Sequence, residues 1–205
     1  EILDAPGDKY QLTVYDPAYQ PPRWFGEGIT YNIFPDRFCR DRMPVQPEGE
    51  GMAPRVLHEN WDDIPVYRPD ENGEILNNDF FGGTLRGVIS KLDYLEKNNV
   101  NYIHLMPFLE TPKGRSDGGY AVADFRKVQE NLGTMDDLKE LTGACHKKGI
   151  SVCMDFVMNH TSEDHEWAKK ARQGDGEYMS RYFFYDNSYI PSLYEKTVPQ
   201  VFPTT

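Results

Sequence analysis

Cysteine, positive charge and long apolar runs are all scarce in this chain. The three cysteines, Cys39, Cys145 and Cys153, are odd in number and widely spaced, which favours reduced thiols over a disulfide framework or a zinc site. The 22 Lys and Arg residues are outnumbered by 33 Asp and Glu, for a net charge of -11, and they form no basic stripe. Because nucleic-acid backbones are bound by such stripes, we expect no nucleic-acid partner.

Membrane and export signals are missing as well. The sequence has no run of about 18 apolar residues, and its N-terminus has neither the basic region nor the hydrophobic core of a signal peptide. We therefore expect a soluble chain with no membrane partner and a cytoplasmic location. At 205 residues the chain is long enough for one sizeable core.

Apolar patterning predicts strands and helices in alternation. Strands are predicted at 29–34 and 100–106, and a third apolar run, 150–160, contains Asp155 and ends in the polar pair Asn159 and His160. One helix is predicted from apolar residues at helical spacing: Leu85, Val88, Ile89, Leu92 and Leu95. A second is predicted from Thr134, which has Asp137 at capping-box spacing, to Gly149.

This order predicts an α/β fold in which the strands pair in parallel through right-handed crossovers. The segments that follow the three strands, 35–79, 107–133 and 159 onward, are much longer than the about two to six residues of a structural connection. Parallel strands place these segments at one end of the sheet. Long loops on one side indicate a binding or catalytic site there.

The first residues predict a different unit. Residues 10–15 alternate like a half-buried strand, and residues 16–22 contain three prolines, as an extended linker does. We interpret residues 1–22 as the last strand of an N-terminal β domain followed by its linker.

Five short motifs occur in order along the predicted elements. They are Tyr-Asn-Ile-Phe-Pro-Asp-Arg-Phe at 31–38, Phe-Phe-Gly-Gly at 80–83, Ser-Asp-Gly-Gly-Tyr at 116–120, Leu-Gly-Thr at 132–134 and Asp-Phe-Val-Met-Asn-His at 155–160. Together they resemble the α-amylase family, glycoside hydrolase family 13. The first half is similar to neopullulanases and cyclomaltodextrinases, and the second half is similar to amylosucrases.

The resemblance implies a partial (β/α)8 barrel, or TIM barrel. Residues 23–160 would supply its first three strands and two helices, and residues 161–205 the start of domain B, an excursion after the third strand. Because such barrels need about 250 residues, we expect the chain to be part of a larger enzyme. That enzyme would cleave an α-glycosidic bond with retention, acting on an α-glucan or a sucrose-type oligosaccharide.

The resemblance also implies roles for individual residues. Tyr120 would stack on a glucosyl ring beside the cleaved bond, His160 would hydrogen-bond a hydroxyl of that ring, and Asp117 would help form the floor of the pocket. Asp155 and Tyr31 would support the site structurally. Taken singly, a tyrosine beside glycines is often a loop anchor, an aspartate a turn residue and a histidine a strand cap.

Calcium is the only cofactor that the resemblance implies. Asn159 matches a calcium ligand of many α-amylases. A second calcium site, known near the first loop of neopullulanases, has an aspartate after the double glycine. This chain has Thr84 at that position, which removes a carboxylate from a site for a hard cation.

The two catalytic carboxylates of a retaining glycosidase are not expected in this sequence. The family nucleophile lies in a Gly-x-Arg-x-Asp pattern, which does not occur in the chain. We therefore expect the chain alone to be inactive. Two alternatives stay open: an amylosucrase-like glucosyltransferase that uses sucrose, and a catalytically silent carbohydrate-binding or partner-stabilising subunit.

Two further expectations concern surfaces. An unclosed barrel leaves an unpaired strand edge and an apolar face, so we expect the chain to associate with itself. Aromatic residues recur between Tyr182 and Tyr194, and we interpret them as the packing of a small subdomain in preference to a carbohydrate-stacking platform.

Overall fold

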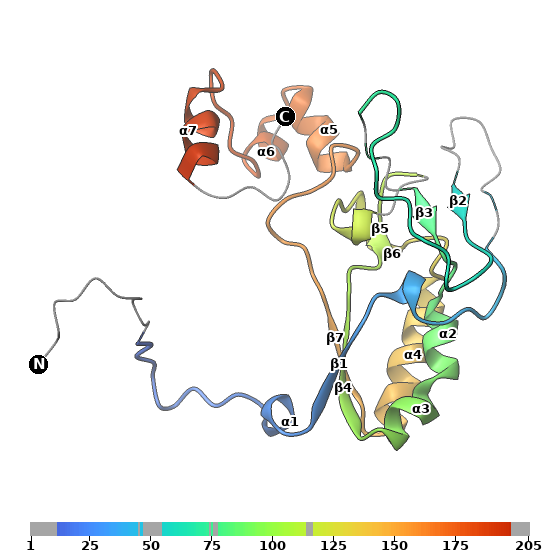
Figure 1. Cartoon of the computed structure of the whole chain (residues 1–205). Coiled ribbons are helices and arrows are strands. Elements are labelled where there is room, and N and C mark those ends of the chain that lie inside the picture. The colour runs from blue at the N-terminus through green and yellow to red at the C-terminus, as the bar shows by residue number, and fades with distance from the viewer. Residues whose placement is uncertain are drawn as a thin grey trace, which may run out of the picture.

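The computed structural model describes residues 12–44, 46, 55–73, 75, 78–113 and 117–197. Its centre is a three-stranded sheet of β1 (Ile29–Ile33), β4 (Val100–Leu105) and β7 (Ser151–Met154), in the order β1-β4-β7. Both pairings are parallel (Figure 1). The predicted alternation of strands and helices and the parallel sheet are therefore confirmed.

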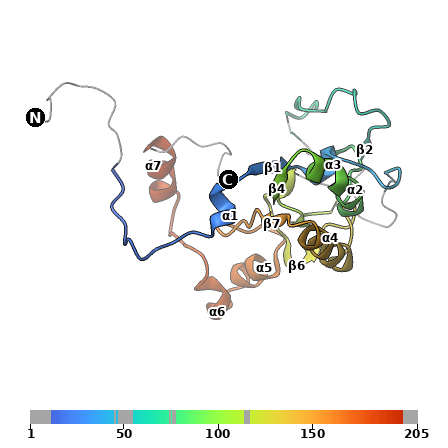
Figure 2. The same cartoon turned by 90° about the horizontal axis from the view of Figure 1, so that it is seen from below.

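Helices cover one face of this sheet. They are α2 (Leu85–Ser90), α3 (Leu92–Lys97) and α4 (Met135–Lys147), which lie together on one side in Figures 1 and 2. The helix predicted over 85–95 is divided in two, because Lys91 has φ -105° and ψ 6° and ends α2 before α3 begins. The predicted start of α4 is confirmed, since Thr134 and Asp137 form a reciprocal capping box.

The core lies between the sheet and these helices. Fully buried side chains of β1 and β4, such as Ile33, Ile103 and Leu105, contact apolar residues of α2, α3 and α4. Among the helical partners are Leu85, Val88, Leu95, Leu141 and Cys145. All three cysteines are free thiols.

The remaining elements are short. Helix α1 (Arg23–Gly26) precedes β1, and η1 (Pro35–Arg37) follows it. The loop between β1 and α2 contains β2 (Val56–Leu57) and β3 (Asp79–Phe80), and the loop after β4 contains β5 (Leu109–Glu110), η2 (Asp117–Gly119) and β6 (Asp124–Val128). Three helices follow β7: α5 (Glu166–Arg172), α6 (Gly176–Met179) and α7 (Tyr189–Thr197). Figure 1 shows β2, β3, β5, β6, α5 and α6 beyond the same end of the sheet.

The third strand is shorter than predicted. The apolar run predicts a strand to residue 160, but β7 ends at Met154, where the Asp155 amide makes one more hydrogen bond to the Leu105 carbonyl, at 2.9 Å. The cause is the neighbouring strand, because β4 ends at Leu105 and offers no further partners. The chain from Asp155 onward is therefore free to leave the sheet toward α5.

Residues 12–15 form no strand and are exposed. Tyr10 and Gln11, the other residues of the predicted N-terminal strand, lie outside the described residues. A strand needs a neighbour, and none of the described residues pairs with this segment. The N-terminal β domain stays a prediction, as do the boundaries at 22 and 160. No helix in the described part of the chain has the length and apolar character needed to cross a membrane.

We predict that the isolated chain associates with itself. In the described sheet β1 and β7 each pair on one side only, and apolar side chains near these edges are exposed, including Ile29, Phe156 and Met158. Open edges and apolar patches promote association. Light scattering should give a mass above that of one chain. A monodisperse monomer whose β7 amides are fully protected from hydrogen exchange would contradict this expectation.

We also predict that the capping box of α4 is a stability determinant. Thr134 accepts the Asp137 amide at 3.1 Å, and Asp137 accepts the Thr134 amide at 2.8 Å and bonds Arg86 of α2 at 2.9 Å. Thr134→Ala should lower the free energy of unfolding by about 1 kcal/mol, the usual cost of losing a cap. Thr142→Ala is the matched control, because the Thr142 hydroxyl donates only within α4, to Lys139. It should leave stability nearly unchanged.

The contribution of the capping box to stability should depend on pH, with a sign that follows from the pKa of Asp137. Partial burial raises the pKa of Asp137, but hydrogen bonds from Thr134 and Arg86 outweigh it and hold the pKa below its usual range. The stabilisation by this carboxylate is therefore present above the usual pKa of aspartate and is lost as the pH falls through the lowered value. Chemical unfolding should show a smaller difference between Asp137→Asn and wild type in acid than at neutral pH. An equal difference at both would contradict the assignment.

Candidate functional site

Polar side chains gather on the face of the sheet that the helices do not cover, which we call the inner face. Because successive residues of a strand point to opposite sides, placing Ile33, Ile103 and Leu105 against the helices leaves Asn32 and His104 on the inner face. Asn32 is the register partner of His104, and His104 is the register partner of Cys153. The three side chains thus lie in one row across the three strands.

Three of the predicted site residues meet at the end of the sheet. The Tyr120 hydroxyl donates a hydrogen bond to Asp155 Oδ2 at 2.9 Å, and His160 Nε2 lies 3.0 Å from the backbone carbonyl of Tyr120. A carbonyl only accepts, so Nε2 carries the proton of this bond. These two bonds, with a third from the Ser162 amide to the Val122 carbonyl at 2.9 Å, join the loop after β4 to the segment after β7, although Tyr120 and His160 are 40 residues apart.

The Tyr120 hydroxyl stays protonated and can therefore donate a hydrogen bond. Burial, together with the hydrogen bond to Asp155, raises the pKa of the Tyr120 hydroxyl above its usual value. The phenol therefore keeps its proton across the physiological range, and the Asp155 carboxylate remains its acceptor. This bond fixes the edge of the ring while leaving the ring half-buried.

The turn before Tyr120 depends on glycine. Gly118 and Gly119 have φ values of 73° and 86°, in the region that favours glycine, and a Cβ on Gly119 would overlap the Pro107 carbonyl. The backbone of Asp117 begins this turn as the first residue of η2, while its side chain and all of Ser116 lie outside the described residues. The proposed role of Asp117 stays a prediction.

Tyr31 lies on the other face from this cluster. It is the register partner of Ile103, packs against the core, and makes an edge-to-face contact with Phe38 at 6.1 Å between ring centroids. Any support that it gives to the site acts through the sheet. The supporting role assigned to it from the sequence stays a prediction.

Sequence reasoning missed Asn32 and His104. Residues 100–106 read as one apolar run, so the histidine within it received no role. The signal that could have found it is the alternation of the strand: Ile103 and Leu105 face the core, and the residue between them must face the other way. Asn32 then follows from the register of β1 with β4.

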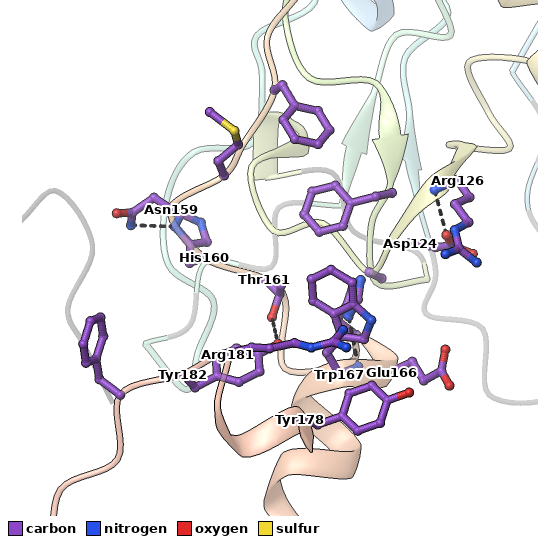
Figure 3. A pocket seen from close by; sticks show the side chains of 16 residues that line it. Asp124, Arg126, Asn159, His160, Thr161, Glu166, Trp167, Tyr178, Arg181 and Tyr182 are labelled. Atoms are coloured by element: carbon purple, nitrogen blue, oxygen red, sulfur yellow. Dashed lines mark hydrogen bonds between the residues drawn. The ribbon is translucent and has the colours of Figure 1, made fainter. Parts of the chain in front are cut away.

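A cavity of about 1080 Å³ lies beside Asn159 and His160 (Figure 3). Its walls come from β6, residues 156–161 and helices α5 and α6. On one wall the Arg181 guanidinium lies 4.3 Å from the Trp167 ring centroid and 4.6 Å from that of Tyr178. Aromatic faces beside hydrogen-bonding groups are suited to sugar rings.

The interpretation of residues 182–194 as subdomain packing is wrong for most of its aromatic side chains. Tyr182 is half-buried and its hydroxyl lies 2.8 Å from that of Thr161. The other aromatic side chains in this stretch are each more than half exposed: Phe183, Phe184, Tyr185, Tyr189 and Tyr194. This part of the chain folds as short helices, which have too little apolar surface around them to bury these rings.

The first loop is held by buried polar contacts. Asp36 is only 2% exposed, and its two carboxylate oxygens accept the amides of Phe81 and Gly82 at 2.9 and 3.0 Å. Burial, opposed by these bonds, raises the pKa of Asp36. The backbones approach so closely that a Cβ on Gly83 would overlap the Pro35 carbonyl. This contact explains Gly83 of the Phe-Phe-Gly-Gly motif, and the φ of 80° at Gly82 explains the other glycine.

Arg40 supplies a positive charge inside this loop. Its guanidinium donates to three backbone carbonyls, those of Phe81 at 2.6 Å, Glu59 at 2.7 Å and His58 at 2.9 Å. It also lies 4.6 Å from the centroid of the Trp61 ring. One side chain thus ties residues 58–61 to the Phe80–Gly83 turn.

Those residues of the first loop that the structure describes do not fit a calcium site. Both oxygens of Asp36 accept amides, and Asp41 Oδ1 accepts the Thr84 hydroxyl at 2.6 Å. Thr84 also caps α2 by accepting the Gly87 amide at 2.9 Å. Hard-cation sites need free carboxylate and carbonyl oxygens, and three carbonyls of this loop, those of His58, Glu59 and Phe81, already accept from Arg40.

Asn159 stays a predicted calcium ligand on the resemblance alone. Its amide Nδ2 lies 3.2 Å from His160 Nδ1, so the amide donates to the ring nitrogen (Figure 3). Within the described residues no group of three or more His, Cys, Asp and Glu side chains could hold a metal ion.

We predict that Arg40, and not a metal, keeps the first loop in place. Arg40→Met should lower the free energy of unfolding by about 2 kcal/mol, because charge-assisted hydrogen bonds are worth about 1.5 to 3 kcal/mol each and this site is partly solvated. A calcium chelator should leave the thermal midpoint of the wild type unchanged. Arg68→Met is the control, since Arg68 is exposed and lies 5.8 Å from the Tyr67 ring centroid. A chelator-sensitive wild type would contradict the prediction.

Sequence comparison finds relatives of one family, and the chain spans a quarter or less of the length of the two named below. Residues 32–203 match the alpha amylase catalytic domain. Amylopullulanase of Thermoanaerobacterium saccharolyticum is 37% identical over 173 residues, which are 80% of this chain and 13% of that protein. Oligo-1,6-glucosidase of Bacillus sp. strain F5 is 40% identical over 127 residues, 62% of this chain and 25% of that protein.

Solved structures agree with the fold. Trehalose-6-phosphate hydrolase of Bacillus licheniformis, as a mutant in complex with PNG, matches with a TM-score of 0.58 and 29% identity over 81% of this chain and 23% of that one. A MutB mutant in complex with the substrate sucrose matches with a TM-score of 0.57 and 26% identity over 83% of this chain and 24% of that one.

The predicted fold class, a partial (β/α)8 barrel, is therefore confirmed. The finer division into a neopullulanase-like and an amylosucrase-like half stays a prediction. Because the alpha amylase match covers most of the sequence and the sheet, helices and loop ends follow the same plan, this chain belongs to the α-amylase family, glycoside hydrolase family 13.

Proposed function

We propose that this chain forms one wall of a glucosyl-binding subsite in an enzyme that cleaves α-glycosidic bonds with retention. The observation that carries the proposal is the cluster of Asp155, Tyr120 and His160 at the ends of two neighbouring parallel strands. In barrels of this kind the ends of the strands form the active site.

Each side chain of the cluster has a chemical use. The Tyr120 ring offers a flat apolar surface to the C–H face of a sugar, and Asp155 keeps that ring oriented through its hydroxyl. His160 is exposed, and its Nδ1 accepts only from the neighbouring Asn159 amide. A sugar hydroxyl can take the place of that amide and donate to Nδ1, while the bond from Nε2 to the Tyr120 carbonyl keeps the ring in position.

The names of the relatives support α-glucans as the substrate class. They include amylopullulanases and oligo-1,6-glucosidases. The described cluster contains a single carboxylate, Asp155, and that group is already bound to Tyr120. Retention requires a nucleophile and an acid about 5 Å apart, so in this proposal both carboxylates belong to another part of the full-length enzyme.

Sucrose is the second candidate substrate. It is favoured by the similarity to the MutB structure in complex with sucrose. Product analysis on pullulan and on sucrose, with the full-length gene product, would separate the two. A third possibility, a catalytically silent binding subunit, would be supported if neither substrate were converted but maltooligosaccharides still bound.

We predict that Tyr120→Ala in the full-length gene product lowers kcat/KM on its preferred glucan about 100-fold, which corresponds to about 2.7 kcal/mol of lost transition-state stabilisation. Tyr120→Phe keeps the ring and loses only the bond to Asp155, so it should cost about 10-fold. Tyr94→Ala is the control, because Tyr94 lies exposed on α3. Unchanged kcat/KM in Tyr120→Ala would overturn the proposed subsite.

The 205-residue chain alone provides the baseline of this experiment. It should release no sugar from pullulan, starch, cyclodextrin or sucrose, because the catalytic pair is missing. Retaining hydrolysis by the purified chain would show that a carboxylate pair has been overlooked.

A further inference from the structure

We propose that His104 is a positioning residue for the glucosyl subsite: it holds Asp155, and through Asp155 the Tyr120 ring, in the orientation that receives the sugar. The inference rests on the proposed function of the Tyr120 cluster. In this proposal His104 does not contact the sugar.

His104 lies in the middle of the sheet. It lies on β4, the central strand, and faces the inner side between Asn32 of β1 and Cys153 of β7. Its side chain is 33% exposed, so it is neither a core residue nor a solvated surface group. From this place it can reach groups that follow both neighbouring strands.

One ring nitrogen is fixed by β1. His104 Nδ1 lies 2.8 Å from Asn32 Oδ1, and an amide oxygen only accepts, so Nδ1 carries a proton. This bond sets the rotation of the imidazole. It therefore also sets where the other nitrogen points.

The other ring nitrogen faces the site. His104 Nε2 lies 4.0 Å from Asp155 Oδ2, the same oxygen that accepts the Tyr120 hydroxyl at 2.9 Å. The distance is within reach of an ion pair but is longer than a direct hydrogen bond. Because Nδ1 already carries the proton of the Asn32 bond, Nε2 attracts Asp155 only in the doubly protonated ring, whose positive charge faces a carboxylate that is itself only 26% exposed.

These contacts form one chain of polar groups across the sheet. It runs from Asn32 through His104 and Asp155 to the Tyr120 hydroxyl, and Tyr120 in turn accepts His160 through its backbone. Asp155 follows the end of β7, where the ladder with β4 stops, so backbone pairing alone does not fix its side chain. His104 supplies that constraint from the neighbouring strand.

Two nearly isosteric variants separate this role from a simple bridge between strands. In His104→Asn the amide nitrogen takes the place of Nδ1, which retains the bond to Asn32 but presents nothing to Asp155. In His104→Gln the amide nitrogen takes the place of Nε2, which presents an N–H to Asp155, as the doubly protonated ring does, but gives up the bond to Asn32. Both should be made in the full-length gene product, with the same pair at His146, an exposed residue of α4, as controls.

The measurements are kcat and KM on the preferred glucan, with the thermal midpoint of every variant. We expect His104→Asn to lower kcat/KM about 10-fold, mainly through KM, because Tyr120 contacts the ring in the ground state as well as in the transition state. We expect His104→Gln to stay within about 2-fold of wild type, and the His146 pair to have no effect. In an Asp155→Asn background, His104→Asn should cause no further loss.

Other outcomes would overturn the inference. If His104→Asn retains activity and His104→Gln loses it, His104 only bridges β1 and β4. If both retain activity while Tyr120→Ala loses it, the subsite is real and His104 has no part in it. If Tyr120→Ala also retains activity, the proposed function itself fails. A loss in both variants together with a lowered thermal midpoint would assign His104 to folding instead.

Discussion

Parallel pairing of β4 with both β1 and β7 is the constraint on which the rest of the structure depends. Parallel strands end at the same edge, so the three long segments that leave them must begin side by side (Figure 1). The α2–α4 layer is what connects the strands in this direction, and it also buries the face that carries Ile103 and Leu105. Asn32 and His104, which alternate with those core residues along the strands, therefore face the inner side of the sheet, where the candidate site lies.

Much of this plan could be predicted from the sequence. The apolar runs and the capping box of Thr134 and Asp137 are local signals, and local signals were sufficient for the order of strands and helices. The resemblance on five motifs identified the family and brought Tyr120, Asp155 and His160 into one hypothesis. The structure joins Tyr120 to each of the other two by a hydrogen bond, although their role with a sugar stays a proposal.

Other features depend on distant partners and had no local signal. The end of β7 is set by the length of β4, not by its own residues, so the run at 150–160 predicted a strand that was too long. Arg40 binds backbone carbonyls, which every residue has, and no motif marks them. The place of Tyr31 on the helix-covered face follows from register alone, and a motif shared with relatives does not report register.

The bond between His160 and Tyr120 uses the backbone of residue 120, not its side chain. A carbonyl is present whichever amino acid occupies the position, whereas the bond to Asp155 requires a hydroxyl. Replacement of the ring would therefore leave the histidine anchored where it is. In the proposed subsite the flat surface and the hydrogen-bonding group are therefore held independently, so that a substitution at position 120 changes the first without moving the strand end that holds His160.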